Sequence, residues 1–303
     1  MNGLVPSARM ILKNDRAGDV ISDKGLRHSG GRQGNVRKID IKYSIMAAQG
    51  ANRASYQDNF LCDRLTYADQ ALPLLASGIQ TEDRQVYAVF DGVGRQGGGK
   101  EAALLAAQTL QKYRDTYLAD PRKDIEKYSI MYLMEVNTKI CEIGTNQSGT
   151  RTGASAALFC MDERRGYVYN VGDSRAYLLR SEKFYVLSED HTEANRLYRL
   201  GALNERQYRE CNRKRRLTQY LGIPAEELVI KPHKASFRLK RGDRILLCTN
   251  GLTRLLEECE IKELLQKPSE RYAEEIWELI RAKGSRDDCT VLICECRQQG
   301  CFG

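Results

Sequence analysis

The sequence predicts an α+β fold in which helices cover antiparallel sheets. Short apolar runs follow one another in the region 154–187, and the turns between them are too short for crossover helices. Longer segments with apolar residues at helical spacing occur in pairs, before and after these runs. No internal repeat is visible, so a solenoid or propeller is not indicated. Clustered strands and paired helices are typical of helices packed on antiparallel sheets.

The elements follow in order. Residues 1–40 are polar, lack sustained periodicity and predict a mobile arm, whereas 41–298 predict one domain. A polar connection and a loop are expected at 50–59 and 72–83. The expected strands are 41–48, 84–90, 154–160, 166–171, 175–180, 183–187, 228–237, 244–249 and 289–295, and the expected helices are about 100–118, 124–143, 193–200, 205–211, 261–266 and 270–283.

Composition narrows the functional classes. The chain has 303 residues, a formal net charge of +8 and ten cysteines without a C-x-x-C pair. The positive charge is spread along the chain, which does not indicate a nucleic-acid surface. No apolar run is long enough for a membrane helix, and scattered cysteines suit a reducing compartment. We therefore expect a cytoplasmic monomer without a membrane or nucleic-acid partner.

The chain is organised around residues 86–103, where an apolar strand leads into Asp91 and Gly92 and then into a glycine-rich turn. A carboxylate fixed by a strand beside flexible backbone is suited to hold a metal ion or a phosphate. The stretch from Gly94 to Lys100 fits most of the phosphate-loop pattern of nucleotide-binding proteins. Glu101 stands where that pattern needs a hydroxyl for magnesium, which disfavours nucleotide binding.

Further polar groups share the position of Asp91, at a strand end or in a glycine turn. They are Asp58, Asp173, Asn250 and Asp287. Any single Asp-Gly pair is more often a turn than a ligand. Together, these hard oxygen donors would suit Mn²⁺ or Mg²⁺. Zinc is disfavoured, because the three histidines lack metal-ligand spacing.

Eight short motifs in order carry a family resemblance over most of the chain. They are Arg53-x-x-x-Gln57-Asp58-Asn59, Val89–Gly94, Gly149-Thr150 with Gly153-Ala154-Ser155, Asn170–Tyr177, Glu189–Thr192, Leu217–Gly222, Cys248–Leu252 and Ser285–Thr290. With these motifs the chain resembles the metal-dependent protein serine/threonine phosphatases of type 2C (PPM), in their bacterial form. The resemblance implies a four-layer α-β-β-α sandwich, two antiparallel sheets flanked by helix pairs, with a two-metal site between the sheets.

The resemblance also implies roles for single residues. Asp91 is similar to the carboxylate that bridges two metals, and Gly92 to the residue that lends a carbonyl. Asp287 matches a direct ligand, and Asp58 matches a residue that reaches the site through water. Asp173 resembles a ligand of a third metal, so two to three ions of Mn²⁺ or Mg²⁺ are expected in each chain.

Arg53 resembles the guanidinium that binds the substrate phosphate, a task that suits its planar fork. The reaction would be hydrolysis of phosphoserine and phosphothreonine on proteins by a metal-activated water. Phosphoprotein substrates and a cognate Ser/Thr kinase system are the implied partners. The stretch 190–222 resembles a flap beside the active site, and its run Arg213–Arg216 is read as a solvated basic face or as a guide for acidic peptides.

Several positions depart from the family pattern. Asn250 stands where an Asp is usual and predicts weakened metal binding. Gln57 removes an outer charge, and Val93 replaces a His that mainly eukaryotic members carry. Asp288, where an Asn is usual, is expected to compensate in part for Asn250, and His191 is expected to hold its own turn. The alternative function is a pseudophosphatase that binds phosphoproteins without hydrolysing them.

Overall fold

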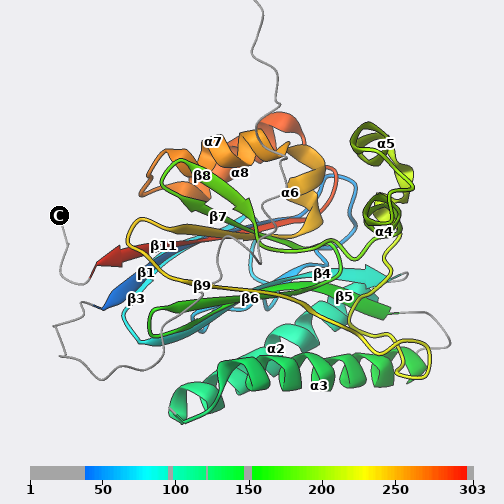
Figure 1. The fold of residues 1–303 in the computed structure, drawn as a ribbon, viewed down its shortest axis with the longest axis horizontal. Coiled ribbons are helices and arrows are strands. Elements are labelled where there is room, and N and C mark those ends of the chain that lie inside the picture. The colour runs from blue at the N-terminus through cyan, green and yellow to red at the C-terminus, as the bar shows by residue number, and fades with distance from the viewer. Residues whose placement is uncertain (1–37, 95–97, 121, 147–151, 299–303) are drawn as a thin grey trace, which may run out of the picture.

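The computed structural model describes residues 38–94, 98–120, 122–146 and 152–298. These residues form four layers, with two β-sheets face to face and helices on both outer surfaces (Figure 1). The predicted arm at 1–37 lies outside the described residues, whereas Ile39 and Asp40 belong to the first strand. No helix in the described ranges is long and apolar enough to cross a membrane.

The two sheets are antiparallel throughout their described pairings. The first sheet has the order β3 (Leu74–Gln80), β1 (Ile39–Ala48), β11 (Cys289–Gln298), β10 (Arg244–Cys248), β7 (Arg175–Arg180) and β8 (Lys183–Val186). The second has the order β2 (Asn59–Cys62), β4 (Arg84–Gly94), β5 (Thr152–Asp162), β6 (Arg165–Val171) and β9 (His233–Arg238).

The helices divide between the two outer faces. The second sheet is covered by α2 (Gly98–Ala119) and α3 (Ile125–Asn146), and the first by α6 (Asn250–Leu255), α7 (Glu258–Gln266) and α8 (Tyr272–Lys283) (Figure 1). Two short helices, α4 (Glu193–Arg199) and α5 (Glu205–Glu210), and the 3₁₀ helix Asn212–Arg215 lie beside the sandwich.

Strand β4 shows why the sandwich forms. Tyr87 and Val89 pack in the core between the sheets, whereas Val86, Ala88 and Phe90 pack against α2 and α3. Successive side chains of a strand point to opposite faces, so an apolar run without alternation is buried on both sides. This arrangement fixes the end of β4, and with it Asp91, between two cores.

The fold differs from expectation at several elements, among them the strand predicted at 228–237, which begins only at His233. The region 72–83 is not a loop throughout, because β3 occupies Leu74–Gln80 and pairs with β1 as an edge strand. Asn250 and Gly251 do not form a simple turn after β10 but begin α6. The presence of β3 leaves the site unchanged, whereas the start of α6 at Asn250 places one face of a helix beside the carboxylates.

Candidate functional site

Asp91 lies near the end of β4, opposite Ser155 on β5. The side chain is buried, and its Oδ2 atom has no hydrogen-bond partner among the described residues. Burial, followed by the charges of Asp58 and Asp173, raises the pKa of the Asp91 carboxyl well above its usual range. A buried carboxylate with an unpaired oxygen is costly unless a cation or proton satisfies it.

Gly92 allows the backbone to close around Asp91. A Cβ atom at this position would lie 2.3 Å from the Gly99 carbonyl oxygen and 2.4 Å from that of Gln57. Both contacts are far shorter than van der Waals separation, so the start of α2 and the Gln57 backbone can approach only a glycine. A glycine at position 92 is therefore required by packing alone.

Asp58 joins the two sheets. It precedes β2 of one sheet, and its Oδ2 accepts hydrogen bonds from the hydroxyls of Thr249 at 2.7 Å and Thr290 at 2.8 Å, which belong to the other sheet's strand ends. The Tyr56 hydroxyl lies 2.5 Å from the Thr290 hydroxyl. Burial and the charge of Asp288 raise the pKa of Asp58 to about 7, against the opposing effect of the two threonine hydroxyls.

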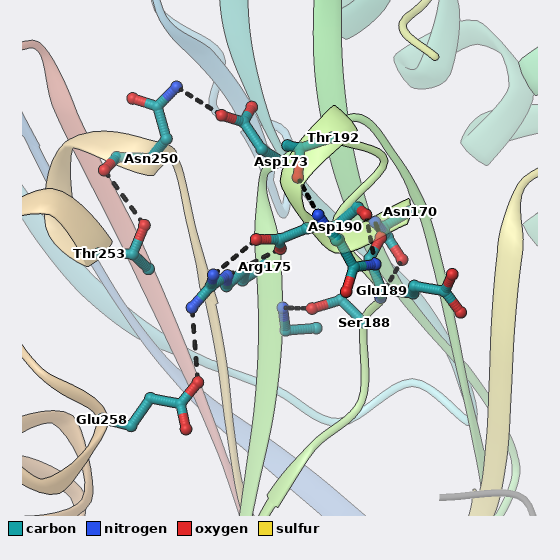
Figure 2. A network of polar contacts seen from close by, with 12 residues as sticks. Asn170, Asp173, Arg175, Ser188, Glu189, Asp190, Thr192, Asn250, Thr253 and Glu258 are labelled. Carbon is teal, nitrogen blue, oxygen red and sulfur yellow. Dashed lines mark hydrogen bonds and ion pairs between the residues drawn. The ribbon is translucent and has the colours of Figure 1, made fainter. Parts of the chain in front are cut away.

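Asp173 lies in the tight turn between β6 and β7. One of its oxygens accepts a hydrogen bond from Asn250 Nδ2 at 3.1 Å (Figure 2), and the other, Oδ1, is buried with no partner among the described residues. The turn needs Gly172, whose φ is +96°, because a Cβ there would meet Ser155 at 2.3 Å. Burial and the charge of Asp190 raise the pKa of Asp173.

Asp287 is held by two arginines. Arg53 Nη2 lies 3.2 Å from one carboxylate oxygen, and Arg254 Nη1 lies 2.7 Å from the other. The Asp287 side chain is about a third exposed (32%), so it lies at the mouth of the site, whereas Asp91 and Asp58 lie inside. The predicted phosphate-binding Arg53 is therefore at the same edge as the predicted ligands.

Arg254 was missed by sequence reasoning. It lies on α6, and its charge opposes the rise in the pKa of both Asp91 and Asp173. Those two carboxylates and Asp287 in turn raise the pKa of Arg254, despite its partial burial. A single arginine in a short helix gives no sequence signal, because such residues usually face solvent.

The start of segment 190–222, the predicted flap, is anchored through polar contacts next to Asp173 (Figure 2). Arg175 forms a bidentate pair with Asp190, at 2.8 and 2.5 Å, and also contacts Glu258 of α7 at 3.4 Å. The Asn170 side chain donates to the Glu189 carbonyl and accepts from the Glu189 amide. These contacts fix the chain where it leaves the sandwich for α4.

The basic run of the flap is partly neutralised. Arg213 and Arg216 both pair with Glu193 at the start of α4, at 3.0 and 3.4 Å. Exposed pairs of this kind contribute little stability. The two arginines therefore support the interpretation of a solvated basic face.

Two further expectations can be compared with contacts. His191 was expected to hold its own turn, but its Nδ1 accepts a hydrogen bond from the Gly172 amide at 3.1 Å, so it connects that turn with the turn that carries Asp173. Asp288 has a further role besides its charge, which helps to raise the pKa of Asp58: its oxygens accept hydrogen bonds from the amides of Gly50 at 2.9 Å and Gln57 at 2.8 Å. Asp288 thus holds the loop that carries Arg53. Its compensation for Asn250 stays a prediction.

Some of the carboxylate oxygens at this site are suited to a hard divalent cation, and others are not. Asp91 and Asp173 each present a buried, unpaired carboxylate oxygen, which is the chemistry that Mn²⁺ and Mg²⁺ prefer. Among the residues that the structure describes, however, no three acidic, histidine or cysteine side chains gather closely enough to hold an ion as they stand. Asp287 is turned to its two arginines. The free oxygens of Asp91 and Asp173 are thus suited to a hard cation, whereas each oxygen of Asp287 is paired with an arginine.

The four-layer architecture is shared with solved protein phosphatases. The catalytic domain of the serine/threonine protein phosphatase PstP, solved with two manganese ions, superposes with a TM-score of 0.69 at 21% identity, over 86% of this chain and 100% of that chain. The fold of this protein is therefore an α+β sandwich with the same architecture as these solved structures.

Sequence comparison identifies the family. The family described as Protein phosphatase 2C matches residues 47–289, and the chain belongs to that family. The serine/threonine phosphatase stp of Listeria innocua is 29% identical over 71% of this chain and 86% of its own length. The protein phosphatase PhpP of Streptococcus pneumoniae is 26% identical over 69% of this chain and 85% of its own length. The resemblance to bacterial phosphatases and the fold class predicted from the sequence are confirmed.

Proposed function

We propose that this protein hydrolyses phosphoserine and phosphothreonine on proteins with the help of Mn²⁺ or Mg²⁺. The observation that carries the proposal is the buried carboxylate of Asp91, with an unpaired oxygen and two carboxylates, Asp58 and Asp173, close enough to raise its pKa. Such a cluster attracts a hard cation strongly, because the ion removes both the burial cost and the mutual repulsion.

The chain's own groups would act as follows. Asp91 and the carbonyl of Gly92 would hold the ions, with Asp287 as a further ligand and Asp173 as the ligand of a third. Asn250 would be a weakened ligand, since its amide oxygen carries no charge. Asp58, fixed by Thr249 and Thr290, would orient bound water. When bound, the metal supplies the charge that brings the pKa of water near neutrality.

Arg53 would bind the phosphate of the substrate. Its loop is fixed by Asp288, and its guanidinium already contacts a carboxylate, Asp287, with the oxygen geometry that a phosphate also offers. In Arg53→Lys, kcat/KM should fall roughly 10–100-fold because the planar fork is lost. Arg64→Lys, in an exposed turn, is the matched control and should leave kcat/KM unchanged.

Manganese titration with a chromogenic phosphate ester and a phosphothreonine peptide tests the proposal. Turnover should rise with manganese and fall more than about 100-fold in Asp91→Asn. Asp83→Asn, an exposed carboxylate at the far end of β4, is the control and should keep full turnover. Absence of turnover at millimolar manganese, with phosphopeptide binding retained, would contradict hydrolysis and indicate the pseudophosphatase.

The remaining parts of the proposal concern the partner, the compartment, the oligomeric state and the number of metal ions. A protein phosphatase needs a kinase that supplies its substrate, so we propose a cognate Ser/Thr kinase system as a partner. We also propose that the protein is a cytoplasmic monomer and that two to three ions bind to each chain. Sedimentation of the purified protein tests the monomer, and the stoichiometry of manganese binding tests the ion count.

A further inference from the structure

Helix α6 presents two polar side chains to the acidic site from one face. Asn250 and Arg254 are four residues apart, a spacing that places both on the same side of a helix. Asn250 Nδ2 donates to Asp173 at 3.1 Å, and Arg254 Nη1 lies 2.7 Å from Asp287. The helix therefore brings a neutral donor and a permanent cation to carboxylates on two separate turns.

Arg254 also acts electrostatically on carboxylates other than the one with which it forms an ion pair. Its positive charge lowers the pKa of Asp91 and of Asp173, and these two groups with Asp287 raise its own pKa. The guanidinium thus acts on three carboxylates, Asp287 through a 2.7 Å contact and Asp91 and Asp173 through its charge. It cannot lose its proton in a protein, so this cation is always present.

The same contacts oppose a divalent ion. Asp287 is a poorer metal ligand through the oxygen that it shares with Arg254 at 2.7 Å, because the guanidinium already balances part of its charge. An ion near Asp91 would also be repelled by a fixed positive charge, and this repulsion is strong at short range in a partly buried site. Arg254 is only a third exposed (33%), so water does not screen it fully.

We propose that Arg254 is a built-in cation that competes with divalent metal for Asp287 and neutralises the acidic site when no metal is bound. The proposal rests on the proposed function, because it concerns the same carboxylates. In the metal-free protein, Arg254 holds Asp287 and reduces repulsion between Asp91 and Asp173. Metal binding to Asp287 then has to overcome this ion pair, so the ion pair lowers the affinity for metal.

Two opposite effects of one substitution test the proposal. Arg254→Gln should bind Mn²⁺ about tenfold or more tightly, measured by calorimetry and by manganese EPR, because a competing charge is gone. The same variant without metal should melt at a lower temperature, since three carboxylates lose one of the positive charges near them. Arg254 acting only as a structural support would lower the melting temperature without raising the affinity for Mn²⁺.

The control is Arg286→Gln, which removes the same charge from the exposed residue next to Asp287. It should leave both the Mn²⁺ affinity and the metal-free melting temperature near those of the native protein. In an Asp287→Asn background, the gain in affinity from Arg254→Gln should shrink, because the shared carboxylate is gone. Unchanged or weaker Mn²⁺ binding by Arg254→Gln would overturn the proposal.

If Arg254→Gln does not fold, Arg254→Lys replaces it. Lysine keeps the charge but loses the fork that holds Asp287, so an intermediate gain in Mn²⁺ affinity is expected. No gain would again overturn the proposal. A native protein that binds Mn²⁺ without hydrolysing esters would refute the proposed function but leave this competition intact. Equal Mn²⁺ affinities with normal turnover would refute only the competition.

Discussion

The Thr249 hydroxyl donates a 2.7 Å hydrogen bond to Asp58 and so connects the end of β10 in one sheet with the residue that precedes β2 in the other. Thr290 makes the same link from β11. Asp58 therefore contributes to the packing of the two sheets as well as to the predicted water-mediated metal contact. Because the Asp58 carboxylate is buried, loss of the hydroxyl of either Thr249 or Thr290 should destabilise the folded protein.

Replacing Thr249 by Val should destabilise the protein by about 1–3 kcal/mol, because a buried carboxylate loses one of its two hydroxyl donors. The measurement is urea unfolding of the metal-free protein. Thr138→Val on α3 removes an exposed hydroxyl that bonds only to its own helix turn, and it should change stability little. Equal losses of stability in Thr249→Val and Thr138→Val would show that the hydrogen bond between the sheets contributes no more than one within a helix.

Restoring the usual acid with Asn250→Asp should raise the affinity for Mn²⁺ about tenfold. The gross Coulomb gain of one charge near a divalent ion is roughly 8 kcal/mol at about 4 Å, of which desolvation offsets most. The metal-free variant should be less stable, because a donor to Asp173 becomes a like charge. Calorimetry measures the Mn²⁺ affinity of each variant. The control is Asn212→Asp, which changes an exposed amide. An unchanged Mn²⁺ affinity in Asn250→Asp would contradict the prediction.

His191 should make stability depend on pH. Burial lowers its pKa below the ordinary 6.5, and its Nδ1 accepts the Gly172 amide, so protonation would break that bond. The unfolded chain binds the proton more readily than the folded chain, so this contribution is full above about pH 6.5 and is lost as pH falls below it. Urea unfolding between pH 5 and 8 should show a weaker pH dependence in His191→Gln than in the native protein. An identical slope in both would refute the assignment.

Weakening the ion pair between Arg175 and Asp190 should make the predicted flap more mobile. In Arg175→Lys the bidentate contact with Asp190 is lost, and α4 becomes less firmly attached to the turn that carries Asp173. Hydrogen exchange should increase across 190–200 by about tenfold or more, while the strands of the sandwich stay protected. Arg206→Lys, in an exposed pair within α5, is the control. Exchange that rises equally in β4 would indicate global destabilisation instead.

Much of the sandwich and its acidic edge could be predicted from the sequence. Asp91 and Asp173 follow apolar runs and stand beside glycines, so local pattern alone marked them. The edge strand β3 was missed because its residues include Ser77 and Gly78 and are mostly half-buried or exposed, without a clear alternation. Arg254 was missed because its meaning depends on the tertiary approach of α6 to Asp287, which no local pattern encodes.

The close contact of Gly92 with Gly99 also limits how this protein can be redesigned. The backbone of β4 and the first turn of α2 touch where a methyl group would collide, so a library that randomises either codon should lose nearly all folded members. Directed evolution toward new substrates has room in the flap and in the exposed loops, whereas this glycine contact has to be kept as found.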